Sequence, residues 1–282
     1  MTGIQKFTEK TRREENEMKK ALALVLAVLL LGTFTACTGT GSTAAETTAA
    51  ETTAADTAKT SYRVGICQLV QHDALDAATQ GFEDTLKSLL GEDKVVFDYQ
   101  VASGDSATCN TIVNSFVSKK VDLILANATP ALQAAYNATA EIPILGTAIT
   151  EYGVALSLDS FDGTVGGNVS GTSDLAPLTE QADMILELFP DAKKVGLLYC
   201  SAEPNSEYQV KVVEDYLAEK GVACTRFSFS DSNDIAAVTT KAAADSDVIY
   251  IPTDNTAAAC TETIGNIVLG AKVPVVAGEQ GL

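Results

Sequence analysis

Short apolar runs alternate with longer amphipathic segments along most of the chain. In residues 121–135, an apolar run rich in Leu and Ile leads into the turn 127–130 and then an Ala-rich segment. Such a run is typical of a parallel strand covered on both faces. Thr129 before Pro130 predicts a helix that Thr129 caps, with the proline at the first helical position. Residues 247–259 repeat this strand, polar turn and Ala-rich helix.

Other short segments recur in the same order. Val-Gly followed by Ile or Leu, Glu-Asp, and a proline between two aliphatic residues each occur twice, at residues 64–66 and 195–197, 83–84 and 214–215, and 142–144 and 273–275. Each match is weak alone, but the shared order and similar spacing predict two lobes of similar architecture. Duplication and convergence of the lobes both explain the pattern.

The periodicity predicts strands alternating with helices in both halves. We expect strands at residues 62–69, 95–101, 121–127, 143–147, 154–158, 194–199, 222–229, 248–251 and 273–277. We expect helices at residues 74–90, 106–118, 130–135, 177–188, 206–220, 233–244 and 255–269. This alternation indicates an α/β fold with two doubly wound parallel-sheet lobes. The expected boundaries are 61–160 for lobe 1, 161–174 for a Gly-rich crossover or hinge, and 175–282 for lobe 2.

Polar residues follow most of the expected strands. Parallel sheets place ligand sites beyond the carboxyl ends of their strands, and in two facing lobes those ends meet at the cleft between them. The tips lie at residues 68–73, 127–130, 147–150, 201–206, 253–255 and 278–280. Hydrogen-bonding side chains at helix starts suit a small polar or zwitterionic ligand.

Composition excludes several classes of function. The chain holds 19 Lys and Arg against 37 Asp and Glu, a net charge of −18, which argues against a nucleic-acid partner. Five cysteines follow Cys37 without a CxxC pair, which favours free thiols over a disulfide. With one histidine we expect no metal site, and without phosphate-binding glycine motifs or a nucleophile elbow we expect no cofactor and no catalytic residues.

The first 60 residues predict export. Met18 and two lysines precede the apolar segment 21–31, which is too short to span a membrane and ends shortly before Cys37. We interpret residues 1–36 as a signal peptide, in which the highly charged residues 1–17 make Met18 an alternative translation start, and Cys37 as a site of lipid attachment. Residues 37–60, nearly all Thr, Ala, Ser, Gly and Glu, predict a disordered tether to the cell membrane.

From residue 62 onward the chain resembles a family of ABC-transporter substrate-binding lipoproteins of the periplasmic-binding-protein type I fold, which includes tryptophan and tyrosine receptors. Four segments carry the resemblance: QHDALDAA at 71–78, ATPA at 128–131, GGNVSGTSDL at 166–175 and IPTDNT at 251–256. The resemblance implies two lobes that close on a ligand like a Venus flytrap and deliver it to permease subunits.

Each candidate site residue has a structural alternative. Asp254 could hold a ligand ammonium group or cap the helix that starts at Asn255. Thr129, with the amides of its turn, could hold a ligand carboxylate or only cap its helix. His72 and Asp174 lie in segments that carry the resemblance, and Asn205 lies in the polar tip at 201–206. Each of them could contact a ligand or only solvent. Asn255 follows Asp254 in the same polar tip and is included as a ligand contact.

We therefore expect a monomeric, lipid-anchored receptor on the extracytoplasmic face of the membrane. It would bind an amino-acid-like ligand, with aromatic amino acids among the candidates, for an ABC importer. A sensory lipoprotein of the same fold and an exported α/β enzyme are the alternatives. The sequence ends at Leu282, soon after the expected strand at 273–277, so we expect an incomplete second lobe with an exposed apolar face.

Overall fold

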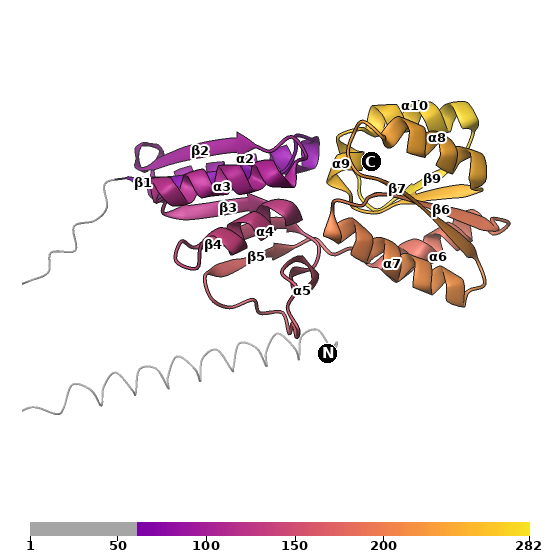
Figure 1. Ribbon diagram of the computed structural model, residues 1–282, viewed down its shortest axis with the longest axis horizontal. Coiled ribbons are helices and arrows are strands. Elements are labelled where there is room, and N and C mark those ends of the chain that lie inside the picture. Colours follow the sequence, from indigo (N-terminus) through magenta and orange to yellow (C-terminus); the bar gives the residue numbers. More distant parts are fainter. Residues whose placement is uncertain (1–60) are drawn as a thin grey trace, which may run out of the picture. The chain divides into compact units, whose positions relative to one another are not determined.

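Two parallel β-sheets organise the protein in a computed structural model that describes residues 61–282 (Figure 1). The predicted signal peptide, Cys37 and the predicted tether lie outside the described residues. The first sheet has five parallel strands in the order β2-β1-β3-β4-β5. They are β1 (Tyr62–Gln68), β2 (Val95–Val101), β3 (Leu123–Asn127), β4 (Ile144–Ile149) and β5 (Val169–Ser173).

Helices cover both faces of this sheet. They are α2 (Asp73–Leu90), the short 3₁₀ helix η1 (Glu92–Lys94), α3 (Ser106–Lys119), α4 (Thr129–Ala138) and α5 (Tyr152–Ala155). Val64 and Ile66 pack with residues of α2, whereas Cys67 belongs to a larger cluster with residues of α3 and α4. Successive side chains of a strand point to opposite faces, so these two clusters are the two sides of one sheet.

The second sheet has four parallel strands in the order β7-β6-β8-β9. They are β6 (Lys194–Cys200), β7 (Ala223–Phe229), β8 (Val248–Ile251) and β9 (Val275–Ala277). Its helices are α6 (Leu178–Leu188), α7 (Pro204–Glu219), α8 (Ile235–Asp245), α9 (Asn255–Ala258) and α10 (Thr261–Ala271). One core cluster joins the sheet to α6 and α7, and another joins it to α8 and α10. The α/β architecture with two parallel sheets is therefore confirmed.

The repeated Val-Gly motif has a steric reason in both lobes. The order of the second sheet reproduces that of the first four strands of the first sheet, so β1 and β6 hold equivalent central positions. A Cβ atom on Gly65 would lie 2.6 Å from the Phe116 ring, and a Cβ atom on Gly196 would overlap Ser246. Glycine at these two strand positions lets the Phe116 ring and the Ser246 side chain approach the sheet closely.

Two predicted elements are wrong. Residues 154–158 form no strand, because α5 occupies Tyr152–Ala155 and the Glu151 carboxylate accepts hydrogen bonds from the N–H groups of Gly153 and Val154 at its start. The expected single helix at 255–269 is two helices, α9 and α10, which are separated at Ala259 and Cys260.

The segment predicted as the crossover contains a strand. Val169–Ser173 forms β5, which pairs with β4 and completes the first sheet. The chain leaves this sheet after Ser173, where the Ser173 hydroxyl donates to the Thr150 carbonyl at 2.8 Å and the Asp174 N–H donates to the Ile149 carbonyl at 3.1 Å. These bonds fix the first residues of the connection to α6.

The five cysteines in residues 61–282 are free thiols, as predicted. Cys67, Cys109 and Cys200 are buried, whereas Cys224 and Cys260 keep partial exposure. In the same residue range, no helix combines the length and the apolar character that crossing a bilayer requires.

Candidate ligand-binding site

The predicted ligand contacts all lie in the loops or first helical turns at the carboxyl ends of the parallel strands. Such ends are where open parallel sheets place their binding residues. His72 follows β1, Thr129 follows β3, Asp174 follows β5, Asn205 lies in the first turn of α7 after β6, and Asp254 and Asn255 follow β8. The structure thus distributes these residues over both lobes.

His72 and Asn255 join the two lobes. The Nε2 atom of His72 lies 3.2 Å from Oδ1 of Asn255. The amide nitrogen of Asn255 donates to Oε2 of Glu203 at 2.6 Å, so the amide oxygen faces the imidazole and Nε2–H is the donor. A chain of hydrogen bonds therefore runs from the first lobe to a buried carboxylate of the second.

Glu203 is a central residue that the sequence analysis missed. Its side chain is buried, and its two oxygens accept from the Thr256 N–H at 2.8 Å, the Thr256 hydroxyl at 2.7 Å and the Asn255 N–H at 3.3 Å. These groups form the start of α9, whose orphan N–H groups favour an anion. The sequence clue for Glu203 was its position directly before Pro204. An acidic residue at such a position usually lies exposed at the start of a helix, so the clue did not indicate burial.

Asp254 caps α9, as one of the two sequence alternatives predicted. The side chain is 0% exposed; Oδ1 accepts from the Ala257 N–H at 2.8 Å, and Oδ2 accepts from the Cys200 N–H at 2.6 Å. Burial, together with the charge of Glu203, raises the pKa of Asp254 to about 7. Direct contact with a ligand stays a prediction, and it would require one of these hydrogen bonds to break.

Asn205 lies beside Glu203 with an unused acceptor. It is 5% exposed, and its amide nitrogen lies 3.3 Å from Oε2 of Glu203 and 3.3 Å from the Thr253 carbonyl oxygen. Its Oδ1 atom is buried and has no hydrogen-bond partner. A buried unpaired acceptor is costly, which makes it a natural partner for a ligand N–H group.

The turn between β3 and α4 is strained and incompletely hydrogen-bonded. The predicted capping by Thr129 is wrong, because α4 begins at Thr129 itself and Ala128 holds the cap position without a side-chain bond. Ala128 has a φ of 86°, a conformation that non-glycine residues rarely adopt. The Thr129 hydroxyl and the Asn127 Oδ1 atom are buried without partners. Strain and unmet hydrogen bonds of this kind concentrate at binding sites.

A second missed carboxylate, Glu279, follows β9. Its position is set by Gly278, whose N–H donates to the Ile251 carbonyl at 2.7 Å and whose carbonyl accepts from the Gln181 amide at 3.0 Å. Burial, followed by the charges of Asp174 and Glu203, raises the pKa of Glu279 to about 7. Its Oε1 atom is buried without a partner. The sequence placed a polar tip at 278–280 but did not single out this residue.

Carboxylates cluster in the second lobe and at Asp174, at the start of the connection that leads to it. Asp174 has a pKa raised by burial, although its side chain keeps contact with solvent. No lysine or arginine lowers the pKa of Asp174, Asp254 or Glu279. Like-charged carboxyls without a cation attract a positively charged group. The α4 turn instead offers helix N–H groups and a free hydroxyl, which suit an anion.

The thiols near the site are unsuited to nucleophilic chemistry. Burial, together with the charges of Asp254 and Glu203, raises the pKa of Cys200 to about 12, and burial raises the pKa of Cys260. Only a thiolate is an effective nucleophile, so these groups stay inert near neutral pH. The arrangement suits the binding of charged and polar groups.

The known proteins that this chain resembles are solute-binding proteins. Residues 63–282 match the family described as ABC transporter substrate binding protein. The tyrosine-binding protein of Clostridioides difficile (strain R20291) is 36% identical over 269 residues, which is 93% of this chain and 76% of that protein.

Solved structures agree in fold. An ABC domain from Streptococcus pneumonia in complex with L-Trp is 32% identical, with a TM-score of 0.71 over 77% of this chain and 74% of that chain. A conserved domain protein from Vibrio cholerae is 34% identical, with a TM-score of 0.74 over 79% of this chain and 75% of that chain.

Proposed function

Because the chain belongs to the ABC transporter substrate-binding protein family, it is a solute receptor of an ABC transporter, and we propose that its solute is a free α-amino acid, most suitably an aromatic one. The observation that carries this proposal is the polarity of the site. Carboxylates without a cation lie on the side of the second lobe, and an uncapped helix start lies on the side of the first. A zwitterion complements both. Relatives named for tyrosine and solved with L-Trp support the aromatic class.

The proposed contacts use both lobes. Glu279 and Asp174 hold the ammonium group, with the unpaired Oδ1 of Asn205 as a further acceptor. The Thr129 hydroxyl and the N–H groups of the first turn of α4 hold the carboxylate. His72 and Asn255 link the two lobes beside the site. Asp254 stabilises the start of α9 by accepting a hydrogen bond from the Ala257 N–H.

Ligand analogues test the two charges separately. Isothermal titration calorimetry would compare tyrosine with tyramine, which lacks the carboxylate, and with 3-(4-hydroxyphenyl)propionate, which lacks the ammonium group. We expect micromolar or tighter binding of the amino acid, about −8 kcal/mol, and at least tenfold weaker binding of both analogues. Equal affinity for tyrosine and 3-(4-hydroxyphenyl)propionate would refute the proposed role of the carboxylates.

We further propose that the receptor is monomeric, anchored to the outer face of the membrane through Cys37, and that it delivers its ligand to permease subunits of an importer. The sequence assigned residues 161–174 to the crossover or hinge; because β5 (Val169–Ser173) belongs to the first sheet, we propose that the hinge follows Ser173. Co-purification of the ligand-loaded receptor with a permease and an ATPase would support import. Co-purification with a kinase instead would favour the sensory alternative.

A further inference from the structure

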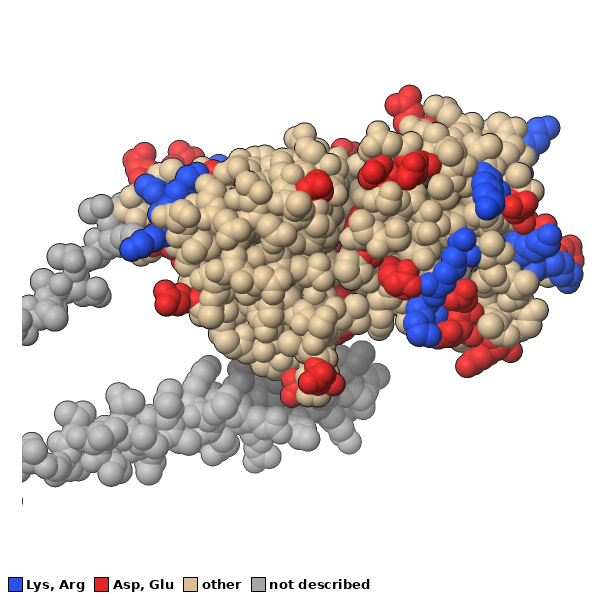
Figure 2. Space-filling view, in the orientation of Figure 1, with Lys and Arg blue, Asp and Glu red and all other residues tan. Residues whose placement is uncertain are grey.

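One face of the first lobe is almost free of charge. In Figure 2 the surface over α3, α4 and α5 is nearly all tan, with acidic and basic side chains only at its margins. Residues 106–118, 129–138 and 152–157 contain no Asp, Glu, Lys or Arg, in a chain with a net charge of −18. Large apolar side chains are also scarce among the exposed residues here, so the face lacks the anchors of a protein–protein interface.

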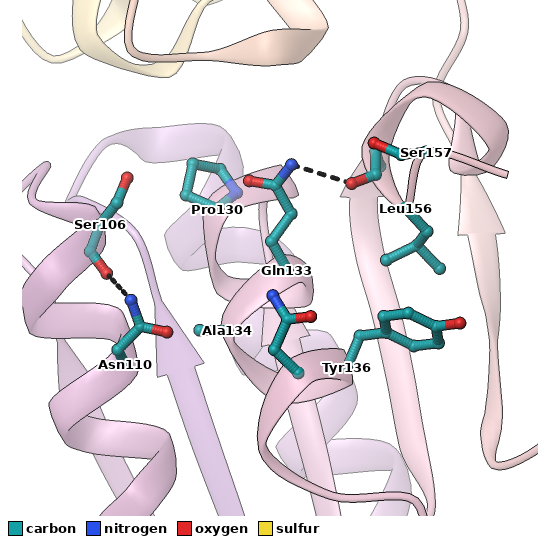
Figure 3. A pocket seen from close by; sticks show the side chains of 10 residues that line it. Ser106, Asn110, Pro130, Gln133, Ala134, Tyr136, Leu156 and Ser157 are labelled. Atoms are coloured by element: carbon teal, nitrogen blue, oxygen red, sulfur yellow. Dashed lines mark hydrogen bonds between the residues drawn. The ribbon is translucent and has the colours of Figure 1, made fainter.

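A cavity of about 440 Å³ opens on this face. It lies between α3, α4 and the loop after α5 (Figure 3), and none of the carboxylates of the candidate ligand site lines it. Its polar lining consists of Ser106, Asn110, Gln133, Tyr136, Asn137 and Ser157. The volume is in the range of small-molecule sites, and the lining is amide and hydroxyl without any charge.

Two of the amides are oriented by the backbone. The Asn110 amide nitrogen donates to the Ser106 carbonyl at 3.1 Å, and the Gln133 amide nitrogen donates to the Ala155 carbonyl at 2.9 Å. Their carbonyl oxygens are therefore left as acceptors of fixed orientation from two different helices (Figure 3). Fixed acceptors bind hydroxyl donors without a further loss of side-chain entropy.

Tyr136 and Ser157 add two features that point to a ligand. Tyr136 is 40% exposed at the cavity, so its ring offers an accessible flat face. Ser157 has a φ of 53°, a left-handed conformation that is uncommon for a non-glycine residue and recurs at binding sites. Aromatic rings combine a large contact area with a polar tip, which suits molecules that have both apolar and hydroxyl faces.

We propose that this cavity is a second binding site, for a neutral saccharide of about two rings. A saccharide carries many hydroxyl donors for the oriented amide oxygens and C–H faces for the tyrosine ring, and it needs no countercharge. Charged ligands find no partner in the lining, and purely apolar ligands would leave its amides unpaired. The cavity adjoins the proposed amino-acid site only at the first turn of α4, where Pro130 lines the cavity, and none of the other residues proposed to hold the amino acid lines it, so the two proposals are tested by different variants.

Saturation-transfer NMR and calorimetry on the full chain test this site with N,N′-diacetylchitobiose as the probe. Tyr136→Ala and Asn137→Asp should each weaken binding at least tenfold, because they remove the ring face or introduce a negative charge. Tyr99→Ala is the matched control, since Tyr99 is 39% exposed on β2 and does not line the cavity. Thermal unfolding of each variant would verify folding.

The outcomes separate clearly. Loss of binding in Tyr136→Ala and Asn137→Asp, with normal binding in Tyr99→Ala and Thr129→Val, supports the site. The absence of saturation transfer to the wild-type chain at millimolar disaccharide, with maltose as a second probe, would overturn it. Loss of binding in Thr129→Val alone would place the saccharide between the lobes and would equally overturn it.

Discussion

The Asn255 side chain donates a 2.6 Å hydrogen bond to Glu203, which links the loop after β6 to the start of α9. Glu203→Ala would leave the Asn255 and Thr256 donors buried without their acceptor. We expect a loss of about 2–4 kcal/mol in the free energy of unfolding, measured by urea denaturation. Glu219→Ala, at the exposed end of α7, is the control and should leave the midpoint unchanged. Equal midpoints for both variants would contradict this role of Glu203.

The raised pKa of Asp254 predicts a stability that falls as the pH rises. Its folded pKa of about 7 exceeds the ordinary value of 3.8, so the folded state binds the proton more tightly. The resulting stability is full below about pH 4 and is lost as the pH rises through 7. Asp254→Asn should flatten this dependence between pH 5 and 8 in urea titrations. Asp247→Asn should not, because the pKa of Asp247 is lowered by backbone N–H groups and its titration lies at acid pH.

Thr129→Val separates binding from stability. The Thr129 hydroxyl is buried without a partner, so its removal should leave the free energy of unfolding equal or slightly higher. If the hydroxyl holds a ligand carboxylate, amino-acid affinity should fall by roughly fivefold to twelvefold, about 1–1.5 kcal/mol. Thr239→Val is a close control, since the Thr239 hydroxyl in α8 is also buried and unpaired. Unchanged affinity in a folded Thr129→Val variant would remove Thr129 from the site.

Two glycine substitutions should act in opposite directions. Gly65→Ala would force a Cβ atom to 2.6 Å from the Phe116 ring and should destabilise the protein by about 1–3 kcal/mol. Gly265→Ala, in α10 with open space around the new Cβ atom, should stabilise it by about 0.5–1 kcal/mol. Thermal and urea unfolding measure both changes. A neutral Gly65→Ala would show that Phe116 moves aside freely.

Cys37→Ser tests the proposed anchor. The variant should lose radiolabelled lipid and leave the membrane fraction, because the thiol that accepts the lipid is absent. Cys260→Ser, which changes a half-buried thiol in the second lobe, is the control and should remain in the membrane fraction. A membrane-bound Cys37→Ser variant without lipid label would exclude lipid attachment at this residue.

Local patterns were enough to predict most of the architecture. The apolar runs and their flanking turns placed the strands within one or two residues in most cases, since burial on both faces of a parallel sheet leaves a continuous signal. The apolar residues of 154–158 gave a false strand because the Glu151 carboxylate starts a helix just before them. The break between α9 and α10 depends on packing in the second lobe and left no clear sequence signal.

The site was harder to predict than the fold. Asp254 and Asn255 stood out because they follow a buried strand, and the structure places them at a helix start beside His72 of the other lobe. Glu203 and Glu279 did not, because an acidic residue in a loop is normally solvated, and only tertiary contacts bury the Glu203 side chain and the Oε1 atom of Glu279. Thr129 has the typical sequence of a cap, and only the backbone shows that its hydroxyl is unused.

The shared winding of the two sheets has one more consequence. The β3–α4 and β8–α9 units hold equivalent positions, yet Glu203 and Asp254 neutralise the start of α9, whereas no carboxylate caps the start of α4. The same building block therefore carries two carboxylates at its helix start in the second lobe and none in the first. Under the proposed function, a zwitterionic ligand between the lobes would have one favourable orientation, with its carboxylate toward α4, and the near-symmetric scaffold would select that orientation through this difference alone.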